Sequence, residues 1–144
     1  MSAPDLYYED VELGDDIGPV RRTVTDEQVA AFINLWREEA PSRFTDPEIA
    51  KGLGLAGTIV PGAMNMAMMS QLITCWSPTV TLKKLDVVFR QVVLHNTPIQ
   101  IKGIVTDKDI VDGSPQLECD VFMENEEGTR MVIGKATVGL SSKA

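Results

Sequence analysis

The sequence has few of the residues that hold metal ions or form covalent cross-links. Among 144 residues there are two cysteines and one histidine. Cys75 and Cys119 lie in separate apolar segments without a Cys-x-x-Cys spacing, and one histidine leaves no cluster of zinc ligands. We therefore expect no metal, no cofactor and no disulfide, and we expect both cysteines to be buried packing residues.

Long apolar runs and positive charge are also scarce. No run approaches the roughly 18 apolar residues of a membrane span, and residues 1–5 have neither the basic nor the apolar region of a leader. We therefore expect a cytoplasmic protein that does not enter a membrane. The 13 lysines and arginines are outnumbered by 21 aspartates and glutamates, which gives a net charge of −8. This balance argues against a nucleic-acid binder, which needs a positive field to attract phosphates.

Apolar residues make up 44% of the chain, which is enough for one domain over 1–144 that buries its own core. A capping box at Thr25 and Gln28 predicts a helix over about 26–37, and a second cap at Asp46 predicts a short helix that ends by Gly52 or Gly54. From residue 62 to 76 the chain is apolar around most of a helical circumference. Such a helix is expected to be enclosed by other structure.

After this helix the apolar period changes to two, which predicts strands at about 85–90, 99–105, 117–124 and 132–140. A fifth strand is expected within 18–25. A buried helix followed by antiparallel strands predicts an α+β protein of the hot-dog type, in which the sheet curls around the helix. The sheet edge and the open side of the helix would remain uncovered, so a homodimer or heterodimer is expected.

Several fragments in order resemble the MaoC-like hot-dog family, the R-specific enoyl-CoA hydratases and related dehydratases. Residues 8–15 are similar to the opening phrase of that family, and residues 44–50 to the stretch that follows its catalytic histidine. Pro61 and Gly62 resemble the His-Gly step that begins its central helix, and residues 88–93 resemble the next Phe-Arg-x-Pro-Val strand. The resemblance covers about residues 8–140 and implies binding of an acyl-CoA or acyl carrier protein thioester.

The catalytic motif of that family, Asp-x-Asn-Pro-x-His-x-Asp, is degenerate here. Aligned on Asp46, the histidine position holds Phe44, the asparagine position Pro41 and the aspartate position Glu39. Phenylalanine cannot transfer a proton, and the longer glutamate side chain displaces its carboxylate from the geometry that a general base requires. Glu39 nevertheless remains the one candidate catalytic residue.

The resemblance also implies a binding site that does not depend on the lost side chains. The glycine amide at the start of the central helix points at the thioester carbonyl in this family, and Gly62 matches that glycine. The substrate-binding candidates are Pro61, Gly62, Ala63, Phe44, Met64 and Arg90. The methionines at 64, 66, 68 and 69 either flank an acyl tunnel or simply fill the core.

Three functional readings remain open. The first is an acyl-thioester-binding subunit without efficient chemistry, paired with a catalytically complete homologue. The second is an active enoyl-CoA hydratase that uses Glu39, and the third is an acyl-CoA thioesterase. Lys83, Lys84 and Arg90 either meet coenzyme A phosphates or form a solvated sheet face. His95 is expected to be a solvated turn residue.

Overall fold

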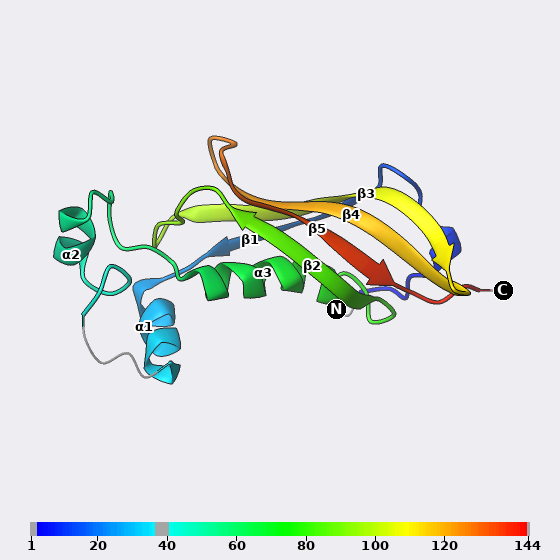
Figure 1. Ribbon diagram of the computed structural model, residues 1–144, viewed down its shortest axis with the longest axis horizontal. Helices are drawn as coiled ribbons and strands as arrows, with labels where there is room; N and C mark the ends of the chain where they lie inside the picture. The colour runs from blue at the N-terminus through cyan, green and yellow to red at the C-terminus, as the bar shows by residue number, and fades with distance from the viewer. Residues whose placement is uncertain (1–2, 37–40, 144) are drawn as a thin grey trace.

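The structure is a computed structural model that describes residues 3–36 and 41–143. In these residues a curved antiparallel sheet accompanies three α-helices and one 3-10 turn (Figure 1). In chain order the elements are η1 (Tyr8–Asp10), β1 (Asp16–Thr23), α1 (Asp26–Leu35), α2 (Pro47–Gly52), α3 (Gly62–Thr74), β2 (Thr81–Phe89), β3 (Pro98–Val111), β4 (Ser114–Asn125) and β5 (Arg130–Gly139).

The five strands lie in the order β1-β3-β4-β5-β2, and every neighbouring pair is antiparallel. β3 and β4 form a hairpin in which Val111 pairs with Ser114 across Asp112 and Gly113. Both turn residues have positive φ angles, of 50° and 78°. Two-residue hairpins favour such turns because their twist matches that of the strands, and Asp-Gly is a preferred pair.

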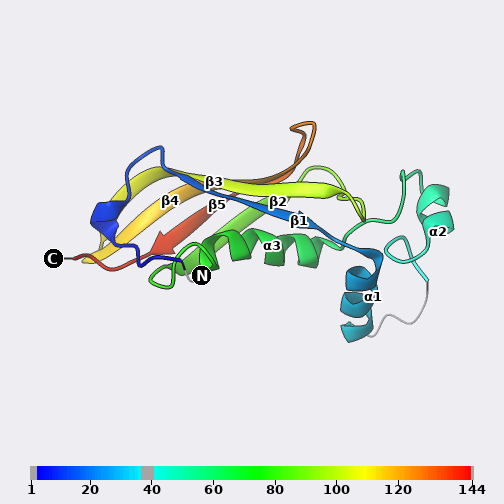
Figure 2. The same ribbon diagram turned by 180° about the vertical axis from the view of Figure 1, so that it is seen from behind.

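Helix α3 lies along the concave side of the sheet, as the two opposite views show (Figures 1 and 2). Helices α1 and α2 lie together beyond one end of the sheet, and η1 and the described C-terminal residues lie at the other end. The α+β hot-dog arrangement predicted from the helix and strand periods is confirmed. The first, second and central helices and all five strands occur where the sequence predicted them, although several ends differ by a few residues.

The core forms between the concave face of the sheet and one face of α3. Met69, Leu72 and Ile73 of the helix are at most 2% exposed. Alternate residues of β3 and β4 face them, because side chains of a strand alternate between its two faces. Burial of these side chains contributes roughly 1.5–3 kcal/mol each before conformational entropy is subtracted. The buried strand residues are Ile99, Ile101, Val105, Leu117, Cys119, Val121 and Met123.

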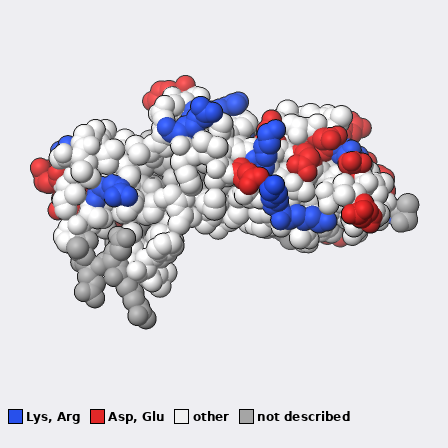
Figure 3. All heavy atoms as spheres, viewed as in Figure 1, with Lys and Arg blue, Asp and Glu red and all other residues white. Residues whose placement is uncertain are grey.

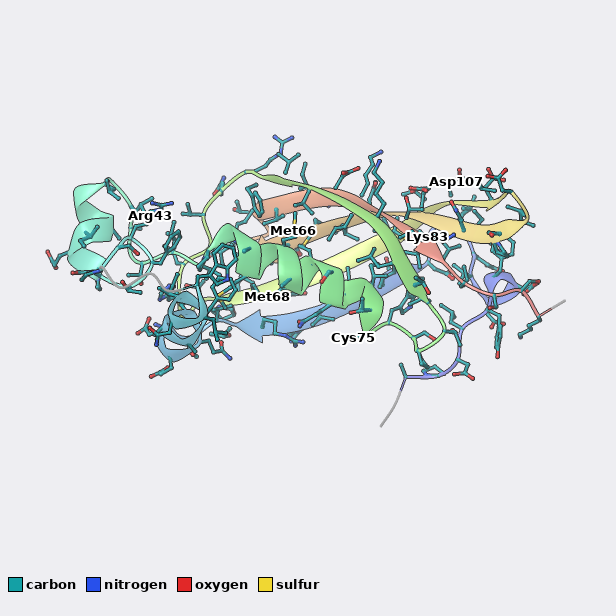
Figure 4. The ribbon with its side chains drawn as sticks, turned by 60° about the horizontal axis from the view of Figure 1, so that its bottom comes forward. Arg43, Met66, Met68, Cys75, Lys83 and Asp107 are labelled. Atoms are coloured by element: carbon teal, nitrogen blue, oxygen red, sulfur yellow. The ribbon has the colours of Figure 1, made fainter. Side chains whose placement is uncertain are left out.

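Helix α3 is not enclosed on all sides as the sequence suggested. Met66 is 41% exposed, and Ala63, Gln71 and Cys75 are exposed on the same side. Figure 4, seen from below, shows α3 lying in front of the sheet with its outer face open. One five-stranded sheet covers only one side of a helix, so small and sulfur-containing residues on the other side remain at the surface.

The two cysteines have different surroundings. Cys119 on β4 is buried as predicted, whereas Cys75 follows the last turn of α3 and is exposed. The prediction of a buried Cys75 was wrong because this residue continues the open side of α3, which the sheet does not cover. In the described part of the chain, no helix is long and apolar enough to cross a membrane.

Candidate functional site

A hollow of about 280 Å³ opens at the N-terminal end of α3. It is formed where the segment before α3, the loop before α2 and the chain after β2 meet. Three of the residues predicted from the sequence, Phe44, Gly62 and Arg90, line it together. The other lining residues are Arg43, Ile59, Val60, Asn65, Phe89, Gln91 and Val92.

Backbone hydrogen bonds from both sides fix the segment that leads into α3. The Ile59 amide donates to the Arg43 carbonyl at 3.2 Å, and the Val60 amide donates to the Val93 carbonyl at 2.8 Å. Ile59 also forms an isolated antiparallel bridge with Leu94. The segment is therefore held between two others, which places residues 43 and 44 beside the start of α3.

The loop before α2 is shaped by Ser42. Its hydroxyl accepts from the Phe44 amide at 3.2 Å, and its carbonyl accepts from the Asp46 amide at 2.8 Å. Asp46 then caps α2 by accepting from the Glu48 amide at 2.9 Å. Short hydroxyl and carboxylate side chains favour such turns and caps. These hydrogen bonds fix the backbone at Phe44, the position at which the family motif has histidine.

Phe44 is half-buried and packs against the core. The guanidinium carbon of Arg43 lies 4.5 Å from the centre of its ring, a cation–π contact. Arg43 lies beside α2 in Figure 4. Glu39, the candidate catalytic residue, lies outside the described residues.

The first turn of α3 presents two backbone donors. Pro61 precedes the helix, and its carbonyl accepts from the amides of Met64 and Asn65 at 3.0 and 3.2 Å. The amides of Gly62 and Ala63 have no acceptor among the described residues. The aligned peptide dipoles add partial positive charge at this end of the helix. An oxygen with negative character is therefore favoured there.

Phe89, at the end of β2, stands over the helix start. A methyl group added at Gly62 would lie 3.5 Å from the nearest ring carbon, at ordinary contact distance. The space beside the Gly62 Cα is thus bounded by an aromatic ring. Glycine leaves this space open for a ligand atom.

Asn65 is a residue of the site that the sequence analysis did not identify. It is 4% exposed, and its Oδ1 is buried without a hydrogen-bond partner among the described residues. The spacing in the sequence could have identified it. Asn65 follows Gly62 by three residues and precedes Met69 by four, so the three residues share one helix face. A polar side chain on the face that packs on the sheet is unusual.

The remaining candidates lie around the hollow or away from it. Pro61 is buried as the N-cap residue, Ala63 is exposed on the open side of α3, and Met64 packs against the core. Met68 and Met69 belong to the core, so these two methionines pack in the core and do not line an acyl tunnel. Met66, labelled in Figure 4, is on the open side.

The lysines of β2 do not line the hollow. Lys84 pairs with Asp86 at 3.3 Å on a solvated face, and both side chains are about 70% exposed. Charged groups of both signs mix near the end that carries the termini, whereas the surface around α3 is largely uncharged (Figure 3). Arg43 and Arg90 are the charged residues that line the hollow.

None of the described residues that line the hollow is Asp, Glu, His, Cys, Lys or Tyr. Arginine stays protonated throughout the ordinary pH range. The site therefore offers hydrogen-bond donors, positive charge and apolar walls, but no described side chain that exchanges protons near neutral pH. It can bind and polarise a carbonyl oxygen but is poorly equipped for general acid–base chemistry.

His95 lies behind the site instead of in solvent, so the prediction of a solvated turn residue was wrong. It is 9% exposed. Its Nδ1 lies 2.8 Å from Asp26 Oδ1 and 3.1 Å from Thr58 Oγ1, and its Nε2 lies 3.0 Å from the Ile59 carbonyl oxygen. The turn brings the ring under the segment before α3, where these distant residues surround it.

A larger hollow of about 410 Å³ lies on the outer face of the sheet, where Val88, Phe122 and Ile133 are flanked by charged residues. The guanidinium carbon of Arg130 lies 3.9 Å from the centre of the Phe122 ring. Every residue in this hollow belongs to a strand, and no helix end reaches it. It contains none of the predicted site residues.

Comparison with known proteins identifies the fold. No protein-family model and no curated protein sequence matches the chain. Among solved structures, the unliganded R-hydratase PhaJ1 from Pseudomonas aeruginosa is 16% identical with a TM-score of 0.83, over 96% of this chain and 88% of that one. A MaoC-like dehydratase from Rhodospirillum rubrum is 17% identical with a TM-score of 0.81, over 96% and 99%.

A third similar structure is a heteromeric complex, the C-terminally truncated HadBC (3R-hydroxyacyl-ACP dehydratase) of Mycobacterium tuberculosis. It is 17% identical with a TM-score of 0.72, over 88% of this chain and 96% of that one. At these identities the likeness is one of fold, and it makes the chain a hot-dog protein. Within that class it has the MaoC-like form of the fold, as the sequence resemblance predicted.

Proposed function

We propose that the chain is one MaoC-like domain that binds an acyl thioester of coenzyme A or acyl carrier protein without efficient chemistry of its own. The observation that supports this most directly is the hollow at the start of α3. It combines two free backbone donors with apolar walls and lacks a described proton-transferring side chain. The Gly62 amide would hold the thioester carbonyl, as an oxyanion hole does.

Phe44 is the second support. It lies beside Gly62 in the same hollow, at the position that the family motif gives to histidine. General acid–base catalysis contributes roughly 10²–10⁴-fold to a rate, so the replacement should lower hydration by about that factor. Arg43 and Arg90 at the rim would attract the phosphates of the carrier.

We further propose that the chain pairs with a catalytically complete homologue, which supplies the missing acid and base. The similar HadBC structure is, by its name, a complex of a 3R-hydroxyacyl-ACP dehydratase. The open face of α3 and the unpaired edge of β2 are the surfaces that a second hot-dog subunit would cover. β2 pairs only with β5 within the described chain.

The test begins with the isolated chain. Calorimetric titration with butyryl-CoA should show binding, whereas crotonyl-CoA should not be hydrated at enzyme-like rates of about 1–10³ per second. Homologous chains that copurify with this chain should then restore hydration of crotonyl-CoA. Turnover by the isolated chain that is lost in Glu39→Gln would contradict the proposal in favour of a hydratase. Release of free thiol from butyryl-CoA would indicate a thioesterase.

Gly62→Ala tests the proposed role of the Gly62 backbone amide. The added methyl group meets only the Phe89 ring at ordinary contact distance, so the melting temperature should be unchanged or slightly higher. The same methyl group occupies the space beside the amide, and we expect affinity for butyryl-CoA to fall about tenfold or more.

Gly52→Ala is the matched control for Gly62→Ala. A methyl group there meets nothing within 4 Å, and the position is exposed at the end of α2. It should leave binding unchanged. Equal affinity of both variants and the wild type would show that the ligand carbonyl does not use the start of α3.

A further inference from the structure

We propose that the outer face of the sheet is an assembly surface, on which two copies of this chain pack against each other around a two-fold axis. This face lies on the opposite side of the sheet from α3 (Figure 1). It is therefore separate from the hollow at Gly62 and from the open side of α3. The inference goes beyond the proposed function and does not depend on it.

Three hydrophobic side chains lie next to one another on this face. Phe122 of β4 pairs with Ile133 of β5, and Ile133 pairs with Val88 of β2. Val121 and Met123 are buried in the core, so the Phe122 side chain between them points outward, because side chains alternate along a strand. Val88 is 55% exposed. A contiguous hydrophobic patch on an exposed face indicates an interaction surface.

The shape of this face is a ridge between two hollows. Phe122 and Arg130 line both the hollow of about 410 Å³ described above and a second hollow of about 450 Å³, which extends towards β1. These two side chains therefore separate the hollows. The guanidinium carbon of Arg130 lies 3.9 Å from the ring centre, and this cation–π contact holds the positive charge on the ridge. A ridge beside a hollow can interlock with a second copy of itself.

The charged residues of this face form complementary pairs across β4 and β5. Asp120 of β4 is opposite Lys135 of β5, and Glu124 of β4 is opposite Arg130 of β5. Glu124 already pairs with Lys102 at 2.6 Å. Asp120, Lys135 and Arg130 form no ion pair with any described residue, so their charges are available to a partner.

A two-fold axis between β4 and β5, parallel to the strands, exchanges the positions of these two strands. Cross-strand neighbours lie at the same position along the strands, so the axis places Phe122 of one copy over Ile133 of the other. It likewise places Asp120 over the other copy's Lys135, and Arg130 over the carboxylate that it faces on β4. Each contact occurs twice, as an isologous interface requires. Apolar groups thus meet apolar groups, and anions meet cations.

A second copy is the occupant that these observations favour. Sheets that pack face to face lie about 10 Å apart, a separation that long side chains from both sheets fill together. A face with charge of one sign would attract a partner of the opposite sign. Here anions and cations alternate between two adjacent strands instead. A partner must present the same alternation at the same spacing, and a copy of this chain does so by symmetry.

The experiment uses the Met66→Glu chain, so that association through the open side of α3 does not obscure the result. Sedimentation velocity over a range of concentrations should show that this chain still forms dimers. Lys135→Glu and Asp120→Lys, each added separately, place like charges opposite each other twice per dimer and should each raise the dissociation constant at least about tenfold. A 1:1 mixture of the two variants should associate again, because every contact then joins an anion to a cation.

Three further variants separate the interface from the fold. The double variant Asp120→Lys with Lys135→Glu keeps opposite charges both within the chain and between copies, and it should dimerise like its parent. Lys51→Glu makes the same change in net charge as Lys135→Glu at an exposed position on α2, and it should leave dimerisation unchanged. Lys135→Gln places no new like charge within the chain. It should weaken dimerisation in the same direction, and it decides the question if a charge reversal unfolds the chain.

The outcomes separate this contact from the pairing through α3. A Met66→Glu chain that is monomeric at every concentration overturns the outer-face contact and leaves the other pairing intact. Dimerisation that no change at positions 120 and 135 weakens overturns it too, because the copies would then meet elsewhere. Folded reversal variants that fail to associate with each other show that these positions do not face each other across an axis. Binding of a different protein to this face without self-association also overturns the proposal.

Discussion

At the scale of single residues, the proposed binding site at the start of α3 has no described side chain that transfers protons near neutral pH. Phe44 and Gly62 line one hollow, as the motif spacing implied, and Arg90 lies at its rim. Residues 58–60 bring these side chains together, because their backbone forms hydrogen bonds with Arg43 on one side and with residues 93 and 95 on the other. Because backbone groups make these bonds, the geometry tolerates the change of side chain at position 44.

The two cysteines give a prediction at this scale. Burial, with smaller contributions from Glu118 and Asp120, raises the pKa of the Cys119 thiol to about 12, whereas Cys75 is exposed. The thiolate is the reactive form. A thiol-reactive dye should therefore label one cysteine in the native protein and two in guanidinium chloride.

Cys75→Ser should abolish the native reaction completely. Rapid labelling of two thiols before unfolding would show that β4 is accessible, contrary to the structure.

At the scale of elements, His95 joins three segments that are distant in sequence. It contacts the first turn of α1 through Asp26 and the segment before α3 through Thr58 and Ile59. The capping box at Thr25 already fixes the start of α1, with hydrogen bonds of 3.0 and 3.2 Å to Gln28. The His95 contacts therefore link a locally stable helix to the hollow.

This network predicts a dependence of stability on pH. Hydrogen bonds, first from His95 and then from Asn96, lower the pKa of Asp26 below its ordinary value, which is about 3.9. Because the pKa of Asp26 is lower in the folded state, ionised Asp26 stabilises the fold. This stabilisation is complete above the unfolded-state pKa and is lost as the pH falls through the folded-state pKa. Asp26→Asn should therefore lower the melting temperature at pH 6, and the difference should shrink below about pH 4.

Glu27→Gln is the control, because it removes a neighbouring first-turn charge that makes no hydrogen bond or ion pair with His95. Its effect on melting temperature should be smaller at pH 6. A difference between Asp26→Asn and the wild type that grows towards acid pH would contradict the assignment.

At the scale of the whole molecule, one side of α3 remains open. In the view of Figure 3 few charged residues lie near α3, and Met66 on its open side is 41% exposed. Exposed apolar surface next to an unpaired strand edge indicates an assembly surface. This openness agrees with the expectation of a dimer.

Met66→Glu should therefore weaken association of the purified assembly. A carboxylate placed in an apolar interface loses its hydration, and we expect the dissociation constant to rise at least about tenfold. Sedimentation velocity over a range of concentrations measures this change.

Ile110→Glu provides the comparison, since Ile110 is an exposed hydrophobic residue, 58% accessible, near the β3–β4 turn. It should leave association unchanged. A wild-type chain that sediments as a monomer, alone and with homologues, would remove the basis for the proposed pairing.

The residues alone were enough to locate the helices, the strands and the spacing of the candidate site residues. The period change after residue 76, the caps at Thr25 and Asp46, and the Phe44 and Gly62 spacing are local patterns, and local patterns suffice to locate helices, strands and turns. The absence of histidine at position 44 was likewise visible in the residues alone.

Three features became apparent only in the folded protein: the burial of His95, the unpaired oxygen of Asn65 and the open face of α3. Each depends on contacts between segments far apart in the chain; His95 and Asp26, for example, are 69 residues apart. A turn histidine looks solvated until the segment before α3 covers it, and an asparagine looks ordinary until its neighbours provide no donor. Periodicity along the chain carries no information about such neighbours, because they are brought together only when the sheet closes over the helix.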